Sequence, residues 1–94
     1  MTWYRAKYDT SDQKYKIGAR LKVIGESMGA TVQRTRQGDS VQYAGRFSST
    51  ESITRGSVVV MKDNTGRMYS FKIGPISYGM GNIRVYWLEE DGSI

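Results

Sequence analysis

Short extended runs, each closed by turn-forming Gly, Asn, Asp or Ser, limit what this 94-residue chain can fold into more than any other feature. A strand with one buried face alternates apolar and polar residues, and turn residues end it after a few positions. Eleven glycines against one proline also favour tight turns and bulges over helices. The pattern predicts a mostly β chain, and its length predicts a single domain over residues 1–94.

The first half of the chain predicts two separate strands and a hairpin. Residues 3–8 alternate and are expected at a sheet edge. Residues 15–24 are expected to be buried on one face and basic on the other. The buried positions are Ile17, Ala19, Leu21 and Val23, and the basic side carries Lys16, Arg20 and Lys22. Residues 30–47 predict a hairpin that turns at Gln37-Gly38-Asp39.

The second half predicts another hairpin and a closing strand. Residues 57–73 pair around a turn at Asp63-Asn64-Thr65-Gly66, where glycine adopts the left-handed conformation. Residues 83–88 alternate as the last strand. Residues 25–29 and 74–82 are expected to be loops. The core is expected to contain Phe47, Phe71 and Trp87.

One helical turn is expected between the two hairpins. Ser48-Ser49-Thr50-Glu51 fits a capping box, and Gly56 fits the residue that closes a short helix. Five to six short antiparallel strands with one helical turn after the third are typical of a small β-barrel. The sequence therefore predicts a small antiparallel barrel, OB-like or SH3-like, with one short helical turn.

The absence of cysteine and histidine excludes several kinds of chemistry. No disulfide, zinc site of the usual ligands, thiol mechanism or Ser-His-Asp triad can be built. Phosphate-binding glycine motifs are missing, and the acids are too scattered for a two-metal site. We expect no enzyme, no cofactor and no metal, although a metal-free ribonuclease using Tyr, Arg, Lys and Glu stays open. Without a leader-like or membrane-length apolar run, a cytoplasmic location away from membranes is expected.

The net charge of +5 is unevenly distributed along the chain. Residues 1–47 hold nine Lys or Arg against four Asp or Glu, whereas residues 48–94 hold five of each. Such asymmetry indicates a polyanionic partner. The alternative is that the charge only keeps a small domain in solution.

Basic residues interleaved with aromatic ones predict a nucleic-acid interface, because cations neutralise phosphates and aromatic rings stack on bases. The predicted binding residues are Lys14, Tyr15, Lys16, Arg20, Lys22, Arg34, Arg36, Tyr43 and Arg46. The hairpin over residues 30–47 carries the main prediction, because the second and third strands of an OB-like barrel form its oligonucleotide face. Its arginines would contact phosphates and Tyr43 would stack on a base. RNA or single-stranded DNA is favoured, because no recognition helix for duplex DNA is apparent.

Each element of this interface has an ordinary structural alternative. Tyr43 fits a core position equally well. Arg34 and Arg36 also fit the charged residues that keep sheet edges from pairing. At the level of function, the alternative is a protein–protein module such as a small, possibly phage-encoded, inhibitor or regulator of a host protein. The loop over residues 74–82 would then supply adaptable contacts through Tyr78 and Met80. A structural component that assembles through an edge strand is a third hypothesis.

Overall fold

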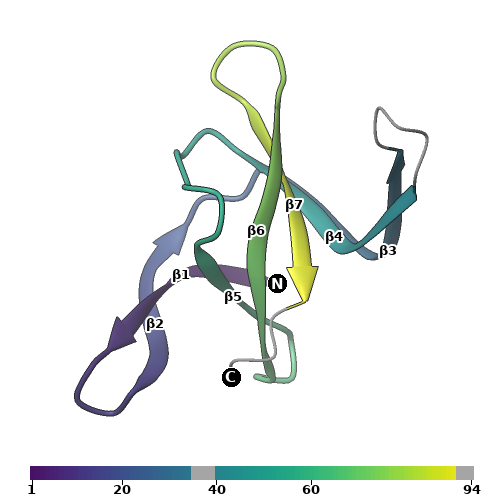
Figure 1. Cartoon of the computed structure of the whole chain (residues 1–94). Coiled ribbons are helices and arrows are strands. Elements are labelled where there is room, and N and C mark those ends of the chain that lie inside the picture. Colours follow the sequence, from purple (N-terminus) through teal and green to yellow (C-terminus); the bar gives the residue numbers. More distant parts are fainter. Residues whose placement is uncertain (35–39, 91–94) are drawn as a thin grey trace.

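The computed structural model describes residues 1–34 and 40–90; for residues 30–34 and 40–42 it describes the backbone alone. The chain forms one antiparallel sheet (Figure 1). Its strands are β1 (Thr2–Asp9), β2 (Lys14–Leu21), β3 (Gly25–Arg34), β4 (Ser40–Ser49), β5 (Val58–Lys62), β6 (Met68–Tyr78) and β7 (Arg84–Glu90). They lie in the order β2-β1-β5-β6-β7-β4-β3. The mostly β prediction is confirmed, with seven strands in place of the expected five or six.

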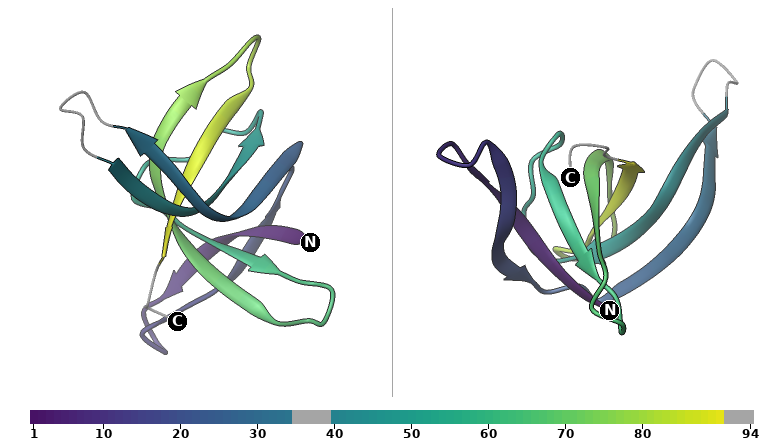
Figure 2. Two further views of the ribbon diagram at one scale, coloured as in Figure 1. Left: turned by 90° about the vertical axis from the view of Figure 1, so that its right-hand side faces the viewer. Right: turned by 90° about the horizontal axis from the view of Figure 1, so that it is seen from below.

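The sheet curls into a half-barrel, so the predicted small antiparallel barrel, OB-like or SH3-like, is found only as an open, curled sheet. Strands β2 and β3 are the two edges of the sheet, yet only residues 22–24 separate them in sequence. The edges therefore meet at one corner and diverge from it. Figure 2 shows the β1–β2 and β3–β4 hairpins spreading as two arms on either side of the central strands. Each arm contains a β-bulge, and bulges bend and twist a strand pair.

The apolar core fills the inside of the curl. It contains Trp3, Leu21, Phe47, Ile53, Val59, Met61, Phe71, Ile73, Tyr86 and Leu88. The Trp3 ring lies 4.8 Å from the Phe47 ring and 6.0 Å from the Phe71 ring, in tilted contacts that favour aromatic pairs. The predicted core positions of Phe47 and Phe71 are confirmed. Trp87 is half-buried on the opposite face, because its neighbours Tyr86 and Leu88 in β7 take the inward positions.

No helical turn forms in residues 48–56, so that prediction is wrong. Strand β4 continues through Ser49, and an irregular segment leads to Gly56 at φ +92°. The Glu51 amide donates to Ser49 Oγ at 3.0 Å, so its acceptor is Ser49 and not the predicted Ser48. The Glu51 carboxylate does not return to its own segment and instead accepts from the Lys22 amide. Tertiary partners for Glu51 thus replace the expected capping box.

Several predicted strand boundaries and exposures also change. The first strand is not an edge, because β1 pairs with both β2 and β5. Strand β2 is the edge, and its expected buried face is largely open: Ile17 is 42% exposed and Ala19 is exposed. Residues 25–29 belong to β3, so the first predicted loop is absent, and β6 extends through Tyr78, so the second predicted loop shortens. The β6–β7 pairing is bulged between Ile73 and Ile76, which accommodates the only proline of the chain.

The second predicted hairpin turn is confirmed. Oδ1 of Asp63 accepts from Thr65 N at 2.9 Å, Thr65 Oγ1 at 2.6 Å and Arg67 N at 3.0 Å. Gly66 has φ +85°, the left-handed conformation that this turn requires. The Thr65 hydroxyl is the main reason that the pKa of Asp63 lies below its ordinary value. The other predicted turn, Gln37-Gly38-Asp39, lies outside the described residues.

Candidate nucleic-acid interface

The β1–β2 arm, with its connection to β3, carries most of the excess positive charge. Residues 1–22 hold six Lys or Arg against two Asp, an excess of four out of the net +5. The basic residues are Arg5, Lys7, Lys14, Lys16, Arg20 and Lys22. Because the arm stands apart from the central strands (Figure 2), this charge is concentrated on one projecting element. Such a concentration attracts anionic partners.

Strand register sorts the side chains of the arm onto two faces, because residues opposite each other in an antiparallel pair share a face. The tyrosine face carries the pairs Tyr8 with Tyr15, Ala6 with Ile17 and Tyr4 with Arg20. The lysine face carries the pairs Lys7 with Lys16 and Asp9 with Lys14. The arm is therefore amphipathic, with aromatic and aliphatic groups on one face and ammonium groups on the other.

A bulge at Gly18 sets this arrangement. Two residues of β2, Gly18 and Ala19, lie opposite Arg5, so the register shifts by one between Tyr4 and Ala6. A Cβ on Gly18 would lie only 2.8 Å from the carbonyl oxygen of Arg5. Glycine is therefore required for the close approach of the two strands. The extra residue places Arg20 on the tyrosine face, whereas strict alternation from Ile17 would place it on the lysine face.

Tyr8 and Tyr15 form the aromatic centre of the tyrosine face. Their rings meet edge to face with centroids 5.2 Å apart. Tyr8 is 51% exposed and Ile17 beside it is 42% exposed. Tyr15 is half-buried, so it supports the half-exposed Tyr8 ring.

The lysine face has one lysine, Lys16, whose charge is balanced by two aspartates, and two lysines, Lys7 and Lys14, without such partners among the described residues. Lys16 Nζ lies 2.7 Å from Oδ2 of Asp9 and 2.7 Å from Oδ2 of Asp12. These contacts raise the pKa of Lys16, first through Asp12 and then through Asp9, and Lys16 in turn is the main cause of the lowered pKa of Asp9. Lys7 and Lys14 are exposed and have no ion pair with any described residue. They are the ammonium groups available to a ligand here.

Arg20 and Lys22 lie where the arm joins the corner of the sheet. Both line an open pocket of about 330 Å³ with Met1, Thr2, Trp3, Leu21 and Val23. Their side chains are exposed and make no ion pair within the part of the chain that the structure describes. The pocket thus offers two cations beside the apolar side chains of Trp3, Leu21 and Val23.

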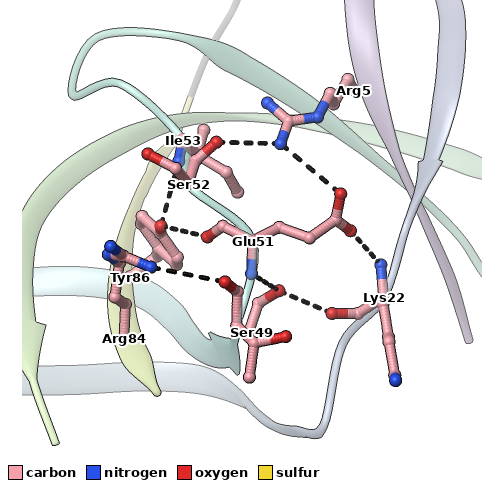
Figure 3. Close-up of polar contacts among 9 residues, drawn as sticks. Arg5, Lys22, Ser49, Glu51, Ser52, Ile53, Arg84 and Tyr86 are labelled. Carbon is pink, nitrogen blue, oxygen red and sulfur yellow. Dashed lines mark hydrogen bonds and ion pairs between the residues drawn. The ribbon is translucent and has the colours of Figure 1, made fainter. Parts of the chain in front are cut away.

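A set of polar contacts, here called the corner network, fixes the base of the arm (Figure 3). Its members are Arg5, Lys22, Ser49, Glu51 and Tyr86. Glu51 Oε2 accepts from Lys22 N at 2.6 Å, and Ser49 Oγ donates to Lys22 O at 2.6 Å. Arg5 Nη2 lies 3.6 Å from Glu51 Oε1. Three separate segments of the chain therefore meet at this corner.

The corner network continues into the core through Tyr86. The Tyr86 hydroxyl donates to Glu51 O at 2.6 Å and accepts from Ile53 N at 3.0 Å (Figure 3). Tyr86 is fully buried, and so is Ser49. Buried polar groups that are satisfied in this way hold a rigid geometry. The orientation of the arm is thus set by contacts that reach the middle of the sheet.

The predicted residues of the other hairpin lie on a separate surface, at the opposite end of the sheet order. Tyr43 is only 6% exposed and its ring packs on Trp87 at 5.5 Å, so it is a buried residue outside the main core cluster and does not offer an exposed ring for stacking. Arg46 is exposed, with its guanidinium 5.4 Å from the centre of the Trp87 ring. Arg34 lies on β3, but its side chain is outside the described part, as is all of Arg36.

The structure therefore places five of the nine predicted residues on one arm: Tyr15 and Arg20 on its tyrosine face, Lys14 and Lys16 on its lysine face, and Lys22 at the corner. It adds Lys7 and Tyr8, which the sequence prediction did not include. A signal for both was present: two alternating runs, residues 3–8 and 15–24, are separated by a few polar residues that favour a hairpin. Treating the first run as an isolated edge strand obscured that pairing.

Comparison of the chain with protein-family models, with curated proteins and with solved structures gives no match. Among residues 1–34 and 40–90, no helix has the length and apolar character needed to cross a membrane.

Proposed function

We propose that this protein is a non-catalytic, cytoplasmic binding module whose β1–β2 arm binds single-stranded RNA or DNA. The observation that carries the proposal is the half-exposed Tyr8 ring, held by Tyr15, on an arm with an excess of four positive charges. Binding to unpaired nucleic acid combines base stacking on aromatic rings with neutralisation of phosphates. The arm offers both within one pair of strands.

The residues of the arm have different roles in this binding. A base stacks on Tyr8, and Tyr15 keeps the ring in place. Arg20, on the same face, and Lys22, at the corner, contact phosphates on one side of that base. Lys7 and Lys14 contact the backbone where it crosses the edge of the arm. Lys16 holds the turn through Asp9 and Asp12 and does not contact the ligand.

The test is a titration of fluorescein-labelled single-stranded RNA and DNA of mixed sequence, followed by anisotropy at several salt concentrations. The affinity is expected to fall steeply with salt. Tyr8→Ala is expected to weaken binding by about tenfold, since stacking on one aromatic ring is worth about 1–3 kcal/mol. Arg20→Ala is expected to weaken binding and to lower the salt slope by about 0.7.

Two control variants remove similar groups from another surface. Lys72→Ala removes an exposed cation from β6, and Met80→Ala removes an apolar side chain that is 90% exposed at the tip of the β6–β7 hairpin; neither segment pairs with β1 or β2. Both are expected to bind like the unmodified protein. The proposal fails if no binding is measurable at low salt, or if the controls weaken binding as much as the arm variants do.

The second candidate, a protein–protein module, is favoured by the tip of the β6–β7 hairpin. Met80 is 90% exposed and Tyr78 is 76% exposed at the end of this long hairpin (Figure 1). Exposed apolar clusters of this kind mark protein contacts. In this case a pull-down would recover one dominant protein that survives nuclease treatment and is lost with Met80→Ser. Recovery of nucleic acid alone would contradict it.

A further inference from the structure

A groove on the inner side of the half-barrel lies away from the corner network and the β1–β2 arm. Its volume is about 650 Å³, within the range of roughly 300–1,000 Å³ that ligand pockets occupy. Its lining residues are Met28, Gly29, Tyr43, Ala44, Met61, Tyr69, Phe71, Glu89 and Glu90. The groove thus has aromatic and methionine walls with two carboxylates.

The groove exists because two neighbouring strands separate. Strand β4 pairs with β7 only from Gly45 to Ser49, opposite Leu88 to Arg84. Beyond that point β4 continues its pairing with β3, and within the described part of the chain Glu89 and Glu90 of β7 pair only with β6. Figure 1 shows β7 running down while the β3–β4 arm turns away from it. Among the described residues, β7 therefore presents an open backbone edge at Glu89 and Glu90 along the groove.

The side chains around these edges favour a cation. Neither carboxylate, Glu89 or Glu90, has an ion pair or side-chain hydrogen bond with any described residue. Tyr69 is 39% exposed, and the Arg67 guanidinium already lies 5.9 Å from the centre of its ring. Lysine and arginine side chains combine an apolar stem with a charged end, so they match aromatic and methionine walls next to carboxylates.

We propose that this groove binds a short, extended, basic peptide segment of a partner protein. The segment adds a strand along the open edge of β7, and its lysine or arginine side chains reach Glu89, Glu90 and Tyr69. Main-chain pairing of this kind gives affinity, while alternate side chains give specificity. The volume fits a few residues of one strand, which is why a single segment is a better occupant than the two-stranded arm of a second copy.

The test uses a fluorescein-labelled hexapeptide of alternating lysine and valine, titrated with the full chain and followed by anisotropy. A matched peptide of alternating glutamate and valine, and a lysine–valine peptide methylated on alternate backbone nitrogens, are the ligand controls. We expect saturable binding of the first peptide alone. Glu90→Gln is expected to weaken it about threefold and the double variant Glu89→Gln, Glu90→Gln about tenfold. Tyr69→Ala is expected to weaken it as well.

Asp12→Asn is the matched protein control, because it removes one negative charge from an exposed position far from the groove. Equal weakening by Asp12→Asn and Glu90→Gln would overturn the proposal, as only net charge would then matter. Equal binding of the methylated peptide would overturn strand addition, and failure of every peptide to bind would overturn the site. Self-association that Glu90→Gln abolishes in sedimentation experiments would assign the groove to a second copy instead. Binding of nucleic acid by the arm is measured separately and is unaffected by these outcomes.

Discussion

The carboxylate of Glu51 accepts a hydrogen bond from the backbone amide of Lys22, 29 residues earlier in the chain, at 2.6 Å. This contact joins the segment after β4 to the three-residue link between the two edge strands. The same side chain meets Arg5 of β1. One glutamate therefore ties together the corner where the two edge strands meet, and the rest of each arm diverges from that corner.

Glu51→Ala is expected to lower the free energy of unfolding by about 1–2 kcal/mol, because the Lys22 amide loses a charged acceptor. Glu51→Gln keeps an acceptor oxygen and is expected to cost less than Glu51→Ala. Urea unfolding followed by tryptophan fluorescence measures both, since Trp3 lies in the core. Equal stability of Glu51→Ala and the unmodified chain would show that the corner network contributes little.

Tyr86→Phe is expected to cost about 1–3 kcal/mol of stability while leaving the ring packing against Phe47 intact. The lost hydroxyl is buried, and its removal leaves the Ile53 amide without its acceptor and the Glu51 carbonyl without its donor. Tyr69→Phe, at an exposed position, serves as the control and is expected to be neutral. A Tyr86→Phe variant as stable as this control would contradict the role of the hydroxyl.

Gly18→Ala is expected to disturb the β1–β2 arm, because the new Cβ would meet the Arg5 carbonyl oxygen at 2.8 Å. We expect a stability loss of about 1–3 kcal/mol, typical of overpacking, and weaker binding of single-stranded RNA. Ala19→Ser, at the neighbouring exposed position, is expected to leave both unchanged. Backbone amide chemical shifts would report the altered register, and unchanged shifts in Gly18→Ala would argue against the bulge.

The turn of the arm is expected to loosen at both extremes of pH. The pKa of Asp9 is lowered, mainly by Lys16. Ionised Asp9 therefore stabilises the turn fully above the ordinary pKa of aspartate, and this stabilisation disappears as the pH falls through the lowered pKa. The pKa of Lys16 is raised by Asp12 and Asp9. Protonated Lys16 therefore stabilises the turn fully at neutral pH, and this stabilisation disappears as the pH rises through the raised pKa. Ring signals of Tyr8 and Tyr15 in NMR spectra would follow the acid transition. Asp9→Asn is expected to remove most of that transition, and an unchanged acid transition would count against it.

Local sequence determined the parts of the fold that depend on neighbouring residues. The Asp63–Gly66 turn was predictable because an aspartate side chain and a left-handed glycine specify it within four positions. Alternation identified most of the strands, and the positions of Lys and Arg placed the excess charge in the first half of the chain. The core positions of Phe47 and Phe71 were predictable as well, because large aromatic side chains are usually buried in a small β domain.

Tertiary structure alone decided which strands became edges, which faces were covered and where the candidate site lies. Ile17 alternates like a buried residue, yet it is exposed because no other element packs on its face of the arm. The predicted capping box at Ser48 to Glu51 does not form, because the Glu51 carboxylate binds the Lys22 amide and Arg5 instead. Burial and long-range pairing depend on the arrangement of the whole sheet, and an alternating pattern records only that a strand has two different faces.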